Sequence, residues 1–193
     1  MTTTIYSLVL MLLLAAGAAP DGRQDKQDKN DGREEFSAIL SNISNVGGAG
    51  ITPLTIRINR WTSDADDERL LGILRDKGQG AFLDALLDGK AVGSISTPTS
   101  LKYDFFYARQ SATKDGGRRI MLISDRPMTV SERASAAPSR DYPFTVIDFQ
   151  VPSEGNGEGT LAQQVQLRLL GNILGIENLA TGPMKLGDIK KVK

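Results

Sequence analysis

Two groups of side chains in this sequence have the chemistry to act on another molecule or to bind it. The first group is polar and can transfer protons or bind charge, and it comprises Arg109, Asp125, Arg126, Asp141 and Tyr142. The second group is aromatic, and it comprises Trp61, Tyr103, Phe105, Tyr107 and Phe149. We interpret the first group as candidates for catalysis and the second as candidates for the wall of a ligand site.

The sequence contains no histidine and no cysteine. This absence excludes Ser-His-Asp and Cys-His nucleophile pairs, zinc sites built from His or Cys, haem ligation by these residues, iron–sulfur clusters and disulfides. Carboxylate, Lys, Tyr and Arg chemistry remains, together with oxygen-ligated Ca²⁺ or Mg²⁺. We predict no cofactor and no metal site, because helix capping accounts for the acidic cluster Asp64, Asp66, Asp67 and Glu68.

The polar group indicates an enzyme only if the fold gathers it in one cleft. Asp125 and Arg126 end one predicted strand and Tyr142 opens another, at positions where loops often carry chemistry. We interpret Asp125-Arg126-Pro127 first as a turn with a surface ion pair and only second as part of a catalytic site. We therefore assign no catalytic residue and keep a carboxylate enzyme as an alternative hypothesis.

The aromatic group favours a non-catalytic binding protein. Tyr103, Phe105 and Tyr107 alternate along one predicted strand, so we expect them to share a face. A curved sheet with these rings inside would hold a small apolar or amphipathic molecule, although the same rings also fill ordinary cores. The predicted ligand contacts are Trp61, Tyr103, Phe105, Tyr107, Arg109, Asp125, Arg126 and Tyr142.

The charge balance limits the partners. Lys plus Arg and Asp plus Glu number 23 each, so no field of one sign attracts nucleic acid or an anionic membrane. We expect a monomer that binds a small molecule. The alternative partner is another protein of the cell envelope, which would meet the exposed face of the hairpin at residues 103–124.

The N-terminus predicts export. Residues 1–19 carry no charged side chain and join an apolar run to the small residues Ala15-Ala16-Gly17-Ala18-Ala19, which is typical of a secretory signal peptide cleaved after Ala18 or Ala19. An uncleaved anchor is the alternative. Residues 20–35 are polar throughout and predict a disordered linker, so a single domain should span 36–193. We expect a periplasmic or extracellular protein with no membrane segment beyond the signal.

Short alternating segments bounded by turn residues predict strands at 36–46, 51–61, 91–97, 103–109, 118–124, 144–151, 161–169, 173–180 and 184–192. Between the second and third strands, Ser63 is a suitable N-cap for a helix that Gly78 ends, and a second short helix spans 81–87. The lysines of the last segment favour an edge strand.

These elements predict an α+β fold. We expect an antiparallel meander of about eight strands, barrel-like or strongly curved, with a two-helix insertion between the second and third strands lying at one mouth. A two-layer sandwich is the alternative.

Several short stretches resemble a group of bacterial exported proteins of unknown function. They are Arg60-Trp61-Thr62-Ser63, Tyr107-Ala108-Arg109, Arg118-Arg119-Ile120, Ser124-Asp125-Arg126-Pro127 and Asp141-Tyr142-Pro143-Phe144. The resemblance spans roughly residues 55–189 and implies an exported, single-domain, β-rich protein. It implies no activity and no site residue.

Overall fold

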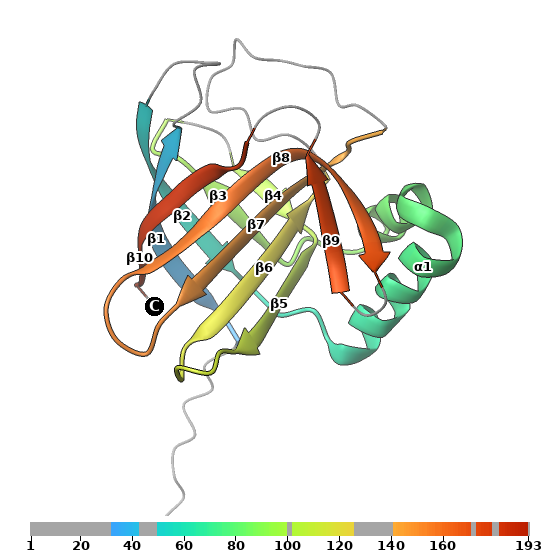
Figure 1. The fold of residues 1–193 in the computed structure, drawn as a ribbon, viewed down its shortest axis with the longest axis horizontal. Coiled ribbons are helices and arrows are strands. Elements are labelled where there is room, and N and C mark those ends of the chain that lie inside the picture. Colours follow the sequence, from blue (N-terminus) through green and yellow to red (C-terminus); the bar gives the residue numbers. More distant parts are fainter. Residues whose placement is uncertain are drawn as a thin grey trace, which may run out of the picture.

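The computed structural model of the chain describes residues 32–42, 50–99, 102–125, 141–170, 173–178 and 182–192. Ten strands and one helix lie in these ranges (Figure 1). In chain order they are β1 (Glu34–Asn42), β2 (Gly50–Ile58), α1 (Asp64–Leu87), β3 (Gly93–Ser96), β4 (Tyr103–Phe105), β5 (Tyr107–Ala112), β6 (Arg118–Ser124), β7 (Phe144–Val151), β8 (Gly157–Leu170), β9 (Ile173–Asn178) and β10 (Met184–Lys191).

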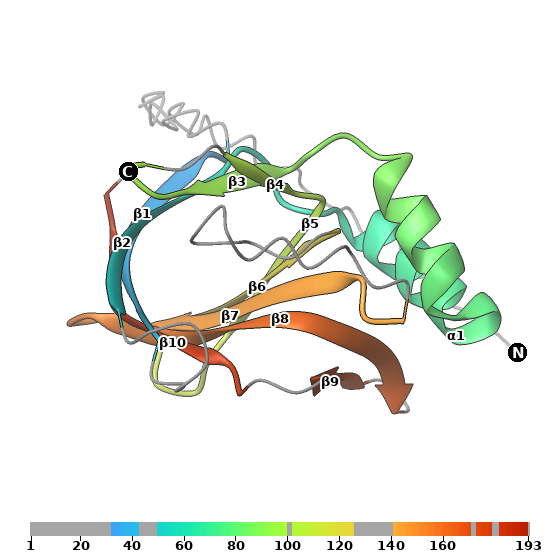
Figure 2. The ribbon, with the colours of Figure 1, turned by 90° about the horizontal axis from the view of Figure 1, so that it is seen from above.

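All ten strands belong to one antiparallel sheet. Its order is β4-β3-β2-β1-β10-β8-β7-β6-β5, and β9 pairs with β8 off this path. The sheet curves round until its two ends approach each other, as the view in Figure 2 shows. The predicted barrel-like antiparallel meander is therefore confirmed, with more strands than the eight or so expected.

The two end strands of the sheet, β4 and β5, are consecutive in the chain and flank Phe106. β4 pairs with β3, and β5 pairs with β6. At the junction the Phe106 amide donates to the Ile123 carbonyl oxygen at 3.0 Å, and Ser124 Oγ donates to the Asp104 carbonyl oxygen at 2.8 Å. One continuous segment, 103–112, thus links the two ends of the sheet and nearly closes the barrel.

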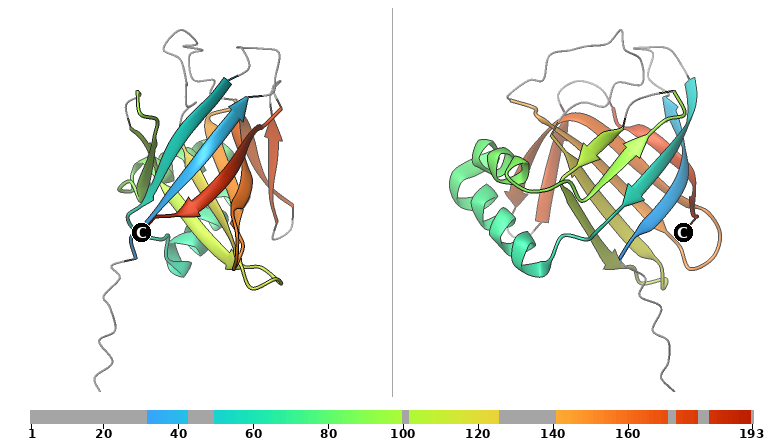
Figure 3. Two further views of the ribbon diagram at one scale, coloured as in Figure 1. Left: turned by 90° about the vertical axis from the view of Figure 1, so that its left-hand side faces the viewer. Right: turned by 180° about the vertical axis from the view of Figure 1, so that it is seen from behind.

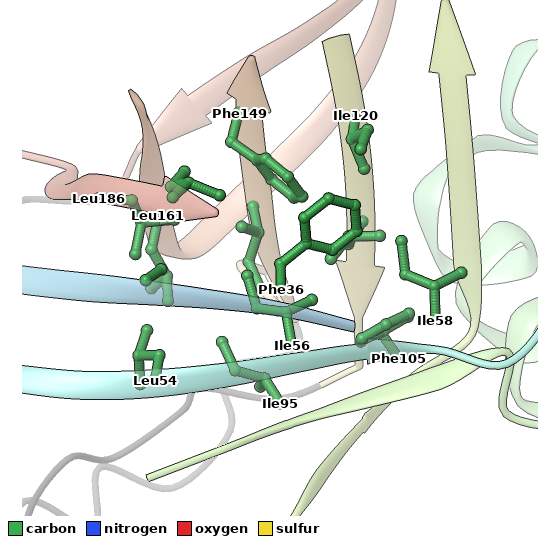
Figure 4. Close-up of a cluster of buried hydrophobic side chains, with 14 of the residues drawn as sticks. Phe36, Leu54, Ile56, Ile58, Ile95, Phe105, Ile120, Phe149, Leu161 and Leu186 are labelled. Atoms are coloured by element: carbon green, nitrogen blue, oxygen red, sulfur yellow. The ribbon is translucent and has the colours of Figure 1, made fainter. Parts of the chain in front are cut away.

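The inner face of the barrel carries an apolar core (Figure 4). Phe36 from β1 and Phe149 from β7 meet edge to face across it, with ring centroids 5.4 Å apart and an interplanar angle of 73°. Because β1 and β7 are not neighbours in the sheet, this contact spans the interior. Further members of the core include Leu54, Ile56, Ile58, Ile95, Phe105, Ile120, Leu161 and Leu186.

The helix α1 begins as the sequence predicts and continues further than expected. Ser63 is its N-cap, and its Oγ accepts from the Asp66 amide at 3.1 Å. The two-helix insertion is not supported as two separate elements, because residues 64–87 form one helix, α1, although this helix has two parts that meet at a kink. Gly78 does interrupt the helical backbone, with φ 81° and ψ 179°, but it produces a kink within the helix. A glycine adopts these angles without the clash that a side chain causes.

The helix packs on the outside of the barrel. Its buried residues Leu70, Leu74, Phe82 and Leu86 join the outward-facing side chains of β5 to β8 in a second apolar core, which we call the outer core. Phe82 lies edge to face with Phe144 of β7 at a centroid distance of 5.6 Å. Figure 3 shows the helix beside the barrel wall. The expectation that the helical insertion covers one mouth is therefore wrong.

Two further expectations are corrected at the chain ends. β10 is not an edge strand, because it pairs with β1 on one side and β8 on the other. Lys185 and Lys190 are exposed on its outer face while Leu186 and Ile189 are buried, and Lys191 lies opposite Phe36 at the end of the strand, beside Glu34. The first strand also begins at Glu34, two residues inside the predicted linker.

An ion pair crosses one end of the barrel. Arg118, the first residue of β6, donates from both terminal nitrogens to the Glu34 carboxylate of β1, at 2.9 and 2.8 Å. Lys191 Nζ lies 3.5 Å from the same carboxylate, whose side chain is 11% exposed. Burial alone would raise the pKa of Glu34, but these cations together hold the pKa below its usual value.

Stability should therefore depend on Glu34 at acid pH. The depressed pKa stabilises the fold above the ordinary Glu pKa of about 4.3, and this contribution disappears as pH falls through the lower pKa of the folded state. Glu34→Gln should cost about 2 kcal/mol of unfolding free energy near neutral pH. The difference in the free energy of unfolding between Glu34→Gln and wild type should shrink toward strongly acid pH, as measured by urea titrations at a series of pH values.

Glu35→Gln is the matched control. Glu35 pairs with Arg57 at 2.8 Å, and both side chains are more exposed, at 26% and 41%. Its replacement should cost under about 1 kcal/mol, because exposed ion pairs contribute little. If wild type and Glu34→Gln lose stability in parallel as pH falls, the buried pair does not act as described.

Some predictions concern residues outside the described ranges. These are the signal peptide at 1–19, most of the linker at 20–35, and Arg126. Within the part of the chain that the structure describes, no helix combines the length and apolar character needed to cross a bilayer.

Candidate functional site

Three of the predicted ligand contacts belong to the barrel interior. Phe105 is fully buried in the inner core, and Trp61 and Tyr103 pack against it while half-buried. Phe105 lies opposite Gly93 of β3, where its ring occupies the space that a side chain at Gly93 would need. The described residues around these rings form a packed core, and a ligand inside the barrel stays a prediction.

Tyr107 and Arg109 lie on the opposite face of the sheet. The expectation that Tyr107 shares a face with Tyr103 and Phe105 is wrong, because Tyr107 belongs to the outer core. The reason is the break at Phe106, where the segment changes its partner from β3 to β6. One residue between two strands reverses which side chains face inward.

Tyr107 and Arg109 anchor the start of α1 to β5. The Tyr107 hydroxyl donates to Asp67 Oδ1 at 2.6 Å, and Arg109 Nη1 donates to Asp64 Oδ1 at 2.7 Å. Arg109 Nη1 also donates to the Thr62 carbonyl oxygen at 3.1 Å, and the Ala108 amide donates to Thr62 Oγ1 at 3.0 Å. We call Thr62, Asp64, Asp67, Tyr107 and Arg109 the anchor network.

The pKa values of Tyr107 and Arg109 are both raised, which gives the anchor network a structural role. Burial first, and then the hydrogen bond to the Asp67 carboxylate, raise the pKa of Tyr107 well above its usual value. The hydrogen bond to Asp64 likewise raises the pKa of Arg109. Tyr107 therefore stays protonated as a donor and Arg109 stays charged, so neither group can act as a general base near neutral pH.

The remaining polar candidates lie elsewhere. Arg109 is level with Met121 in the β5–β6 register, and Asp125 lies four residues further along the chain from Met121, about 13 Å away for an extended strand. Tyr142 is half-buried just before β7, and the Asp141 carbonyl oxygen accepts from Gln79 Nε2 at 2.8 Å. Arg126 lies outside the described residues. The contacts described for Arg109 therefore run to the helix start and not to Asp125 or Tyr142.

A cleft lies beside the anchor network, between α1 and the segments that flank it. It has a volume of about 180 Å³. Its floor is apolar, and three cationic side chains with one carboxylate surround it. We call it the α1 cleft, and its lining comprises Arg60, Thr62, Asp66, Arg69, Leu70, Ala85, Leu86, Gly89, Lys90, Val92 and Phe106.

The cations of the α1 cleft are positioned from three separate segments. Arg60 follows β2, and its Nη2 donates to the carbonyl oxygen of Lys90, in the segment that leads to β3, at 2.7 Å. Arg69 lies on the first turns of α1, 3.5 Å from Asp66. The pair is about half exposed on both sides, at 52% and 50%, so Arg69 is only weakly held by Asp66.

Sequence reasoning did not find this cleft. Arg60, Arg69 and Lys90 are separated along the chain and form no motif. The kink at Gly78 lets the helix reverse its course, so that Leu70 and Leu86 from its two halves line one cleft. The nearest signal in the sequence is the stretch Arg60-Trp61-Thr62-Ser63, whose resemblance to exported proteins implies no site.

Comparison with known proteins gave no match to a family model, to a curated protein or to a solved structure. The resemblance to exported proteins of unknown function stays a prediction.

Proposed function

We propose that this protein is a non-catalytic binding protein that takes a small anion with a short apolar part into the α1 cleft. The observation that carries the proposal is the set of cations around an apolar floor. Arg60, Arg69 and Lys90 outnumber the single carboxylate of Asp66 in the lining. A ligand with the opposite charge and a hydrocarbon portion matches both features.

The floor of the cleft supports an apolar contact. Leu70, Leu86 and Val92 belong to the buried cores, and each is at most 4% exposed. Phe106 adds a half-buried ring at the junction of β4 and β5. A few methylene groups resting there would add roughly 0.8 kcal/mol each when fully buried. The small volume favours a short chain over a long lipid tail.

The barrel serves as a scaffold in this proposal. The anchor network fixes the start of α1 against β5, and the outer core fixes both halves of the helix. A rigid support of this kind keeps the cations in place before the ligand arrives, which reduces the entropic cost of binding. We further propose that the protein is exported, in line with its N-terminal sequence pattern, and that it acts as a monomer.

Hexanoate is a suitable probe of the α1 cleft. We expect hexanoate to shift the amide resonances of residues around Arg60, Arg69 and Lys90 in a saturable way, and hexylammonium to cause no such shifts. The double variant Arg60→Gln with Arg69→Gln should weaken hexanoate binding by about tenfold, because two charge-assisted contacts are lost.

Lys114→Ala is the control for loss of positive charge. Lys114 is an exposed residue in the turn between β5 and β6 and does not line the cleft. Its replacement should leave hexanoate binding unchanged. Equal binding of hexanoate and hexylammonium, or unaltered affinity in the double variant, would contradict the proposal.

A further inference from the structure

Among the residues that the structure describes, the second half of β8 has a strand partner on one side only. β7 pairs with β8 as far as Val165, where its first residue, Phe144, lies opposite. β9 pairs with β8 from Val165 to Leu170. Among the described residues, no strand covers the other edge of 166–170. Alternate residues of a strand direct their N–H and C=O groups to each edge, so this edge presents backbone donors and acceptors.

A groove of about 480 Å³ lies where the kink of α1 meets this part of β8. Leu74, Arg75, Gly78 and Gln79 line it from the helix, and residues 166–169 line it from the strand. We call it the kink groove. It is separate from the α1 cleft, because the two share no lining residue.

Gln79 carries a polar atom without a partner in this groove. Its Nε2 donates to the Asp141 carbonyl oxygen at 2.8 Å, which fixes the orientation of the amide because a carbonyl accepts only from the NH₂ group. Its Oε1 is buried and has no hydrogen-bond partner in the described structure. A buried acceptor of this kind requires explanation, and a donor supplied by a ligand is one.

From these features we infer that the kink groove binds an extended peptide, which adds as a strand to the open edge of β8. The peptide backbone would pair with residues 166–170, and one of its N–H groups would donate to Gln79 Oε1. Leu167 and Leu169 pack toward the outer core, whereas Arg168 is exposed on the alternate face. Its pair with Glu177 of β9, at 3.4 Å, leaves both side chains more than half exposed, at 66% and 55%, so Arg168 is only weakly held and can bind a second carboxylate. The matching peptide therefore alternates apolar with acidic residues.

The test uses the acetylated and amidated peptide Glu-Leu-Glu-Leu-Glu with the full-length protein. Amide resonances of 166–170 should shift and saturate in nuclear magnetic resonance titrations, and resonances around the α1 cleft should not. The same peptide with its alternate backbone nitrogens methylated should bind at least about tenfold more weakly, because it cannot donate to a strand edge.

Two variants of Gln79 separate the acceptor from the bond to Asp141. Gln79→Glu keeps an acceptor, loses the donor to Asp141 and adds a negative charge, so its peptide affinity should equal that of wild type when both are measured at high salt, which screens that charge. Gln79→Leu loses both and should bind about fivefold more weakly or worse. Gln150 is an exposed glutamine on β7, and the control variant Gln150→Leu should bind the peptide with wild-type affinity. Unfolding curves confirm that each variant is folded.

Three results would overturn the inference. They are no binding at millimolar peptide, equal binding of the methylated peptide, and shifts confined to other parts of the sheet. Concentration-dependent shifts at 166–170 without peptide would assign the edge to a second copy of the chain and would also overturn it. Because hexanoate reports on the α1 cleft separately, failure here leaves the proposed function standing.

Discussion

Phe149→Ala is expected to lower the free energy of unfolding by about 3 to 5 kcal/mol. Phe149 is 1% exposed and meets Phe36 edge to face across the barrel interior. Removing the ring discards both its burial and this contact between strands that are not neighbours. If the interior is a packed core, little can move in to fill the cavity. Urea unfolding monitored by Trp61 fluorescence measures the change.

Ile51→Ala is the control for loss of an apolar side chain. Ile51 is 76% exposed on β2, so its replacement should change stability by less than about 0.5 kcal/mol. A small loss in Phe149→Ala, similar to that in Ile51→Ala, would contradict the packed interior. It would also strengthen the alternative in which the barrel holds a ligand.

Gly93→Ala is expected to cost about 3 kcal/mol or more, because it overpacks the place where the barrel nearly closes. A methyl group at Gly93 would overlap the Arg57 carbonyl oxygen and the Phe105 ring. The carbonyl belongs to the neighbouring strand and cannot rotate away, so β3 must shift. The closure through 103–112 depends on β3, and chemical denaturation should show the loss.

Gly187→Ala distinguishes this clash from a general effect of alanine in the sheet. Gly187 lies on β10, and a methyl group there has no atom within 4 Å. The free energy of unfolding of Gly187→Ala should stay within about 0.5 kcal/mol of the wild-type value. If Gly93→Ala and Gly187→Ala lose similar amounts of stability, Phe105 does not pack on Gly93 as described.

The antiparallel sheet was predictable because period-two patterns depend on local sequence. The strands predicted at 118–124 and 144–151 have the same bounds in the structure. The position of β10 was not predictable, because pairing partners are a tertiary property. Lys185 and Lys190 lie on the outer face of a central strand, and the same pattern suits an edge strand.

Single residues account for the other errors. Phe106 reverses the facing of the strand after it, which places Tyr107 in the outer core and not on the expected inner face. Gly78 has the properties of a helix terminator, yet Phe82 and Leu86 pack so well on the outer core that the helix resumes after it. Local propensity predicts the break, and tertiary packing decides whether the helix resumes beyond it.

The α1 cleft could not be predicted for a related reason. Its cations, Arg60, Arg69 and Lys90, come from three segments. The pairing of β2 with β3 brings Lys90 to Arg60, and the kinked helix places Arg69 and both of its halves beside them. Of the predicted contacts, Tyr107 and Arg109 do meet, but they meet Asp64 and Asp67 of the helix. Helix capping therefore explains only part of the role of the acidic cluster, because two of its carboxylates also bind β5.

The central claim is that the barrel is a filled scaffold and that the ligand site lies outside it. The most direct test is the set of intermolecular nuclear Overhauser effects between bound hexanoate and isotope-labelled methyl groups of the protein. We predict contacts from the hexanoate chain to the methyl groups of Leu70, Leu86 and Val92, which line the α1 cleft. Contacts to Ile56, Leu122 and Leu186 of the inner core would contradict the claim.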